Sequence, residues 1–158
     1  MNCFFQPFPA RPLTRFSRRI NPVCLPSLPV EDFSGQSRVV VTIGWGITDA
    51  NQFAKELMKL PRTLLPSKTC ERVLTTFNPF TMVCASDSGG RDQCGGDSGT
   101  GWVSVIKKQS SMVSRWHLVA LTSWGMQCGT APGVGARVSS EAINWIRSMT
   151  AQHSRYVG

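Results

Sequence analysis

Short runs rich in β-branched and aromatic residues, separated by glycine, proline and other turn residues, limit most strongly what this chain can fold into. Near the end the spacing changes, because Ile143, Ile146 and Met149 recur at a helical period. Short strands followed by one helix predict an all-β sandwich or barrel closed by a helix over residues 140–151. The predicted strands are Ser37–Ile43, Phe80–Ala85, Trp102–Ile106, Trp116–Trp124 and Gly133–Val138.

Other segments give weaker local signals. Residues 51–65 are ambiguous, because Phe53, Leu57 and Leu60 have helical spacing but Pro61 interrupts them. The polar residues 107–114 predict the tip of a hairpin between two strands. Ser140 is a candidate cap for the terminal helix, and Glu141 suits the positive end of its dipole.

The length of 158 residues and the hydrophobic fraction of 41% predict one globular domain. We interpret residues 1–10 as an irregular lead-in and residues 11–153 as the domain. There is no apolar run long enough to span a membrane, and the amino terminus lacks the basic start of a signal peptide.

Six widely spaced cysteines, with no Cys-x-x-Cys pair, indicate a disulfide framework and therefore an oxidising compartment. The spacing alone leaves their pairing open. Only two histidines are available as further ligands, so we expect no metal site and no cofactor.

The net charge is +8, with basic clusters at residues 11–19 and at Lys107–Lys108. Such clusters predict a solvated basic face or a site for an acidic polysaccharide. They are not interleaved with aromatic residues in the manner of a single-strand nucleic-acid platform.

The run from Arg91 to Thr100 is the strongest chemical motif, because it places Ser98 between glycines and directly after Asp97. Glycines let backbone N–H groups approach a reacting carbonyl, and a serine nucleophile needs such donors to stabilise the oxyanion that it creates. Taken alone, Gly-Asp-Ser-Gly is also a common tight turn.

Several further landmarks occur in one order, and together with this motif they resemble the carboxy-terminal half of a chymotrypsin/trypsin-family serine protease, over about residues 11 to 150. The resemblance implies the second antiparallel β-barrel of that two-barrel fold, with a C-terminal helix. The landmarks are Pro22–Pro26, Gly44–Gly46, Met82–Ala85, Asp92–Gly99, Ser123–Gly125, Pro132–Val134 and Arg137–Val138 ahead of Ile143–Ile146.

The resemblance implies a role for each residue of the motif. Ser98 would be the nucleophile, and the N–H groups of Gly96 and Ser98 would form the oxyanion hole. Asp97 would support that loop by pairing with an α-ammonium freed by zymogen cleavage. Asp92 would lie at the base of the specificity pocket and favour Lys or Arg. The other implied substrate-binding residues are Gln93, Ser123, Trp124, Gly125 and Gly133.

The resemblance also implies the disulfides Cys70–Cys84 and Cys94–Cys128. A further bridge of the family would join the positions of Val40 and Ser104, and both cysteines are absent. The pairing of Cys24, with Cys3 or with none, stays open.

The sequence departs from the family pattern in ways that concern catalysis. The family places its triad His and Asp well before the serine, but the histidines here, His117 and His153, both follow Ser98. We expect His117 to be structural and His153 solvated. Near the site, Gln93 replaces a small residue, Thr100–Gly101 replaces Gly-Pro, and Gly135 replaces an aromatic residue.

An α/β-hydrolase also has its histidine after the serine, but it is disfavoured. Its Gly-x-Ser-x-Gly motif fails at Thr100, and its serine precedes a helix rather than a strand.

The expected function is therefore a serine endopeptidase with trypsin-like preference for Lys or Arg, in a truncated chain that is inactive alone. The expected partners are protein or peptide substrates, an N-terminal barrel or protease inhibitors. By family we expect secretion. The alternatives are a non-catalytic protease homologue that binds or regulates partners, and a module that binds glycosaminoglycans.

Overall fold

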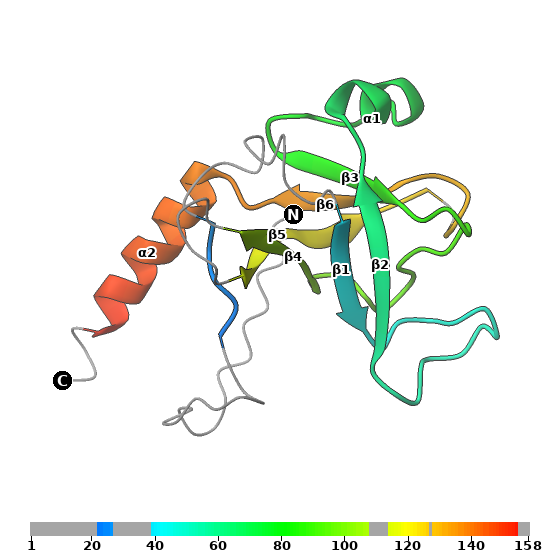
Figure 1. Ribbon diagram of the computed structural model, residues 1–158, viewed down its shortest axis with the longest axis horizontal. Helices are drawn as coiled ribbons and strands as arrows, with labels where there is room; N and C mark the ends of the chain where they lie inside the picture. The colour runs from blue at the N-terminus through cyan, green and yellow to red at the C-terminus, as the bar shows by residue number, and fades with distance from the viewer. Residues whose placement is uncertain (1–21, 27–38, 108–113, 127, 155–158) are drawn as a thin grey trace.

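The computed structural model describes residues 22–26, 39–107, 114–126 and 128–154, which form six strands and two helices around one closed barrel (Figure 1). The predicted all-β barrel with a C-terminal helix is confirmed. The elements are β1 Val39–Gly44, β2 Met58–Leu64, α1 Ser67–Val73, β3 Met82–Ser86, β4 Gly101–Lys107, β5 Ser114–Trp124, β6 Gly133–Arg137 and α2 Ser140–Ser154.

The strand order around the barrel is β1-β2-β3-β6-β5-β4, and every neighbouring pair is antiparallel. The barrel closes where β1 meets β4, with Val41 opposite Val103. At this junction the Ser104 hydroxyl donates a hydrogen bond to the Val39 carbonyl at 2.7 Å. Ser104 and Val40 are both buried here, at the positions where the family resemblance expects a disulfide.

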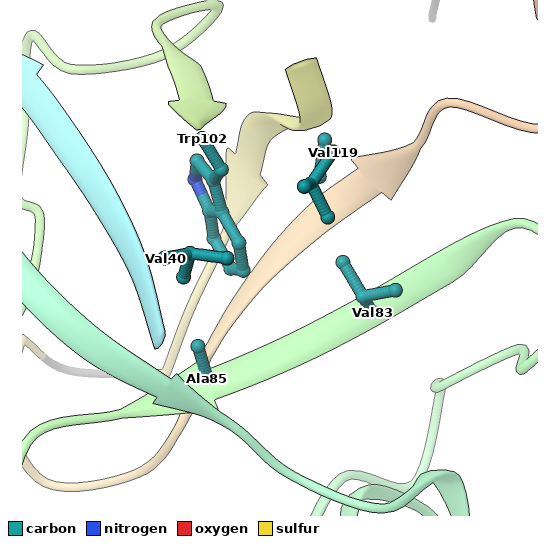
Figure 2. Close-up of a cluster of buried hydrophobic side chains, with 6 residues drawn as sticks. Val40, Val83, Ala85, Trp102 and Val119 are labelled. Carbon is teal, nitrogen blue, oxygen red and sulfur yellow. The ribbon is translucent and has the colours of Figure 1, made fainter. Parts of the chain in front are cut away.

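The barrel interior is filled mainly by small and β-branched side chains around one tryptophan. Figure 2 shows Trp102 of β4 with Val40 and Val119, and all three side chains are fully buried. Val83 and Ala85 of β3 complete the labelled cluster. Val83 and Ala85 alternate along β3, as a period of two requires, whereas Val119 and Ala120 of β5 are consecutive residues of the same cluster.

Strand β2 corrects the helical spacing suspected in residues 51–65. Met58–Leu64 pairs with the whole of β1, and Val41 lies opposite Pro61. Strand β3 pairs only with Thr63 and Leu64, so Pro61 lies where β2 has a strand neighbour on one side only. Proline is tolerated at such a position because no second ladder needs its missing N–H.

Helix α1 and strand β3 are joined by the Cys70–Cys84 disulfide. Both cysteines are fully buried in a second apolar cluster with Leu74 and Val134. The sequence analysis did not predict α1, which is short and contains the β-branched Thr69 and Val73. In Figure 1 this helix lies beside β3, and α2 extends away from the barrel.

Helix α2 follows β6 and begins at Ser140 as predicted, but it is Ser139 that caps it. The Ser139 hydroxyl accepts a hydrogen bond from the Ala142 N–H at 3.3 Å. Ile143, on the inner side of α2, is buried. The tip of the predicted β4–β5 hairpin, residues 108–113, and the lead-in, residues 1–10, lie outside the described residues, although Lys107 pairs with Ser114 at the base of the tip.

Candidate active site

The loop between β3 and β4 carries Ser98 and is fixed at several points. The Cys94–Cys128 disulfide ties it to the segment between β5 and β6. The Gly99 N–H donates to the Thr122 carbonyl of β5 at 2.9 Å, and the Ile47 N–H donates to the Gly95 carbonyl at 2.8 Å. The loop is therefore anchored on both sides of Ser98.

Two glycines with positive φ flank the part of this loop that carries Ser98. Gly96 has φ +96° and Gly99 has φ +83°, and side-chain-bearing residues rarely adopt such values. Ser98 lies between them and is exposed. Within the described part of the chain, the N–H groups of Gly96 and Ser98 have no hydrogen-bond acceptor. Two backbone donors are thus available next to an accessible hydroxyl.

The Asp97 carboxylate turns away from Ser98 toward the end of β1. Its Oδ1 accepts from the Gly46 N–H at 2.8 Å, and its Oδ2 accepts from the Cys94 N–H at 3.2 Å. A Cβ atom at Gly44 or Gly46 would collide with this carboxylate. A cavity of about 210 Å³ borders Asp97 and also contacts Lys59 and Asp92.

A separate pocket of about 170 Å³ brings together most of the predicted site. Ser98 lines it, and so do residues of the β5–β6 segment that the Cys94–Cys128 disulfide joins to the loop. Gly96 and Asp97 do not line this pocket. The predicted residues that it unites are Asp92, Gln93, Ser98, Ser123, Trp124, Gly125 and Gly133.

Ser123 lies at an irregularity in the β5–β6 ladder. Thr122 pairs with Gly135 and Trp124 pairs with Val134, so the register shifts at Ser123. Ser123 and Gly125 are exposed. The end of β5 therefore offers backbone groups to an extended segment beside Ser98.

Asp92, which lines the pocket, forms an ion pair that was not predicted from the sequence, with a residue that does not line the pocket. Arg62 of β2 donates from Nη1 to Asp92 Oδ1 at 2.6 Å, and from Nη2 to Gln93 Oε1 at 2.7 Å. The exposed side-chain fractions of Arg62 and Asp92 are 0% and 4%. The Arg62 guanidinium also lies 4.2 Å from the ring centre of Trp102, at cation–π distance.

Burial sets the electrostatics of this pair. Desolvation raises the pKa of the Asp92 carboxyl, and the nearby Arg62 charge opposes that change. Desolvation likewise lowers the pKa of Arg62, against the attraction of Asp92. Each charge is therefore costly to bury alone, and each is compensated mainly by the other.

Hydrogen bonds extend from the ion pair to the neighbouring strands. Trp102 Nε1 donates to Thr122 Oγ1 at 3.0 Å, and the Thr122 hydroxyl donates to Gln93 Oε1 at 3.2 Å. The Thr100 hydroxyl lies 2.9 Å from the Thr122 hydroxyl. Gln93 and Thr100, two of the departures from the family pattern, thus belong to one network with Arg62.

A protein-family model described as Trypsin matches residues 10–146 of this sequence. The chain belongs to the trypsin family. It is 33% identical over 119 residues to mannan-binding lectin serine protease 1 of Mus musculus, a match that covers 73% of this chain and 16% of that protein.

Further members of the trypsin family show similar likeness. Transmembrane protease serine 9 of Rattus norvegicus is 36% identical over 136 residues, covering 84% of this chain and 12% of that protein. Complement C1s subcomponent of Sus scrofa is 31% identical over 147 residues, covering 85% and 20%. This chain therefore spans at most a fifth of the length of each of these three relatives.

The two trypsin-family disulfides expected from the resemblance, Cys70–Cys84 and Cys94–Cys128, are present. The Cys24 thiol is free, and Cys3 lies outside the described residues. No helix in the described ranges is both long and apolar enough to cross a lipid bilayer.

Only one of the two histidine side chains, that of His117, lies within the described residues. His117 lies in β5 opposite Ser104, with Nδ1 at 3.0 Å from the Arg115 carbonyl oxygen, and it does not line the Ser98 pocket. His153 is in α2, and its side chain lies outside the described residues.

Arg62 could have been found from the sequence if residues 58–64 had been interpreted as a strand. Leu60, Arg62 and Leu64 alternate at a period of two, which puts Arg62 on the inward face between two leucines. A cation in that position needs a buried partner. The sequence does not say which carboxylate it reaches.

Proposed function

We propose that this chain carries the nucleophile half of a serine endopeptidase site, with Ser98 as the acyl-accepting residue. The observation that carries the proposal is the position of Ser98, exposed at a pocket and beside the unpartnered N–H groups of Gly96 and Ser98. In this reaction Ser98 Oγ attacks the scissile carbonyl, and its proton passes to a general base. The two N–H groups stabilise the resulting oxyanion.

The substrate in this proposal is an extended polypeptide. Its backbone adds to the exposed end of β5 at Ser123–Gly125, and one side chain enters the pocket beneath Ser98. We expect protein or peptide substrates on this ground, and also because the relatives are named as serine proteases.

The general base is the part of the site that the described residues do not supply near Ser98. No histidine precedes Ser98 in the sequence, and none in the described part of the chain lines its pocket. We infer that the triad His and Asp come from outside these residues and that this chain alone hydrolyses peptides poorly. Loss of triad members costs about 10⁴–10⁶ in rate.

The test compares the chain alone with a fusion that places a trypsin-family first barrel, with its His and Asp, ahead of it. We expect a fluorophosphonate probe to label Ser98 in the fusion, and to label neither Ser98→Ala nor the chain alone. A folded fusion that is not labelled would exclude the role of Ser98. Stoichiometric labelling of the chain alone would exclude the need for an added base.

A non-catalytic protease homologue is the second candidate, and the replacements at Gln93 and Thr100 beside the site favour it. In that case the same groove binds polypeptides without cleaving them. A folded fusion that binds a peptide at Trp124 but is not labelled at Ser98 would support this candidate.

The expected side-chain preference, the location of the protein and its other partners have different degrees of support. The preference for Lys or Arg stays a prediction, and the Arg62–Asp92 ion pair argues against it. We infer secretion from the two disulfides, because such bonds persist in oxidising compartments. The polysaccharide site, the N-terminal barrel and inhibitors stay predictions, and the basic cluster at residues 11–19 lies outside the described residues.

A further inference from the structure

We propose that Arg62 determines the specificity of the Ser98 pocket: although it does not line the pocket, it neutralises Asp92, which does, and so makes the pocket accept an uncharged side chain in preference to Lys or Arg. This inference rests on the proposed function, because it names the substrate class of that site. It changes the role of Asp92 from a recognition group for substrate to a partner of Arg62.

Arg62 makes the contact with Asp92 that a substrate Lys or Arg was expected to make. Its Nη1 lies 2.6 Å from Asp92 Oδ1, and its Nη2 lies 2.7 Å from Gln93 Oε1. Asp92 Oδ1 also accepts from the Gln93 N–H at 2.8 Å. A second guanidinium or ammonium would have to share or displace these bonds, and displacement would leave Arg62 buried without its counter-ion.

The charge at the base of the pocket is balanced before any ligand enters. Arg62 and Asp92 contribute one positive and one negative charge at 2.6 Å, and both side chains are almost completely buried. An incoming cation meets the Arg62 charge as well as that of Asp92, so the net attraction of an open carboxylate is lost. An incoming carboxylate meets Asp92 in the same way. An uncharged side chain meets neither repulsion.

Gly133, which lines the pocket, leaves room for the Arg62–Asp92 ion pair. A Cβ atom at Gly133 would lie 2.6 Å from Asp92 Oδ1 and 2.7 Å from Arg62 Nη1, so only glycine leaves room for both groups. Gly133 therefore accommodates the internal ion pair, and the space that it leaves is not free for a long substrate side chain.

Three of the departures from the family pattern, Gln93, Thr100 and Gly135, contact Arg62 or residues next to it. Gln93 accepts a hydrogen bond from Arg62 and is held in turn by Thr122, whose hydroxyl lies beside Thr100. Trp102 stacks on the guanidinium. A Cβ atom at Gly135 would lie 3.1 Å from Trp102 Cε2 and 2.9 Å from Ala120 Cβ, so an aromatic residue there would compete with Trp102 for the same space.

These contacts explain the departures together. Gln93 bonds Arg62 directly, Thr100 contacts the Thr122 hydroxyl that bonds Gln93, and Gly135 leaves room for the ring on which Arg62 stacks.

The test measures binding of two probes of equal size, cationic benzamidine and neutral benzamide, to the full 158-residue chain. The readout is the NMR signal of the tryptophan indole N–H groups, and Trp124 reports on the pocket because it lines it. We expect the wild type to bind benzamidine no more tightly than benzamide. We expect Arg62→Leu to gain about tenfold in benzamidine affinity, because Asp92 is then unpaired.

The matched control is Arg147→Leu, which removes the same charge from an exposed position in α2 and should behave as the wild type. If the NMR spectrum of Arg62→Leu shows that this variant is unfolded, Arg62→Gln replaces it, because the glutamine keeps an amide donor for Asp92. The expected gain in benzamidine affinity is the same, because Arg62→Gln also removes the positive charge. The comparison of benzamidine with benzamide on the wild type also tests the inference without any variant.

Two results would overturn the inference: tenfold tighter binding of benzamidine than of benzamide to the wild type, or a folded Arg62→Leu that gains no affinity for benzamidine. Neither involves chemistry at Ser98, so neither would exclude the proposed function. Conversely, failure to label Ser98 in the fusion would exclude that function and leave the measured selectivity of the pocket intact.

Discussion

The Gly46 N–H donates to Asp97 Oδ1 at 2.8 Å, so the carboxylate that precedes Ser98 is held by the residues that follow β1. The other carboxylate oxygen accepts from the Cys94 N–H. The orientation of the loop thus depends on an acceptor at both oxygens of Asp97.

We expect Asp97→Asn to lower the free energy of unfolding by about 1.5–3 kcal/mol, because an amide presents a donor where the carboxylate presents its second acceptor. Urea unfolding measures the change. The control is Asp49→Asn, at an exposed position that lines the same 210 Å³ cavity as Asp97, and it should have little effect on the free energy of unfolding. Equal effects of the two substitutions would contradict the role of these hydrogen bonds.

Two glycines of the pocket should respond differently to an added methyl group. Gly133→Ala should cost about 1–3 kcal/mol, because its Cβ would lie 2.6 Å from Asp92 Oδ1. Gly125→Ala should cost less, since its nearest neighbours would lie at 3.7 Å, an ordinary contact distance. Thermal unfolding of both variants measures the difference, and a larger loss for Gly125→Ala would contradict the geometry.

Removing Arg62 alone should be strongly destabilising. Arg62→Leu leaves Asp92 buried without its partner, and we expect a loss of about 3–5 kcal/mol in unfolding free energy at neutral pH. The double variant Arg62→Leu/Asp92→Leu removes both charges and should recover most of this loss. A double variant as unstable as the sum of the two single variants would show that the residues do not act as a pair.

The loss caused by Arg62→Leu should depend on pH. Burial raises the pKa of Asp92 above its ordinary value of 3.8, and removal of Arg62 should raise it further. Because the pKa of Asp92 is higher in the folded state than in the unfolded state, the contribution of Asp92 to stability is most favourable below about pH 3.8. That contribution is lost as the pH rises through the folded-state pKa. The deficit of Arg62→Leu should therefore shrink in acid.

Unfolding measured at several pH values, together with the carbon-13 shift of the Asp92 carboxyl, checks this expectation. The variant Arg62→Leu/Asp92→Asn lacks the carboxyl and should show no such change. An Asp92 pKa that falls when Arg62 is removed would refute the assignment.

The β1–β4 junction offers a place for a new disulfide. Val40 and Ser104 are both buried at this junction, one position beyond the pairing of Val41 with Val103. Val40→Cys/Ser104→Cys should form a bond under oxidising conditions and raise stability by about 2–4 kcal/mol. Mass spectrometry and thermal unfolding, with and without reductant, measure both effects. Failure of the oxidised pair to cross-link would contradict the register of this junction.

Much of the fold could be predicted because most of the barrel strands have a strand-like local composition. β1, β4 and β5 are dense in β-branched or aromatic residues, and their propensity agrees with their tertiary setting. Strand β2 could not be recognised, since Pro61 contradicts a strand unless its sheet neighbour on one side is missing. Helix α1 is short and depends on Cys70 and Leu74 packing against β3 and β6, contacts distant in sequence.

The sequence by itself determined five of the six strands (β1, β3, β4, β5 and β6), the family, and the glycine-flanked loop with Ser98, because these depend on local propensity and on contiguous motifs. Only the tertiary structure decided what Asp92 does. Its partner lies 30 residues away on a strand that local propensity hides, and a buried carboxylate takes its role from the charge that the fold brings to it. The same carboxylate that predicts a pocket for Lys or Arg is, in the folded chain, already paired with Arg62.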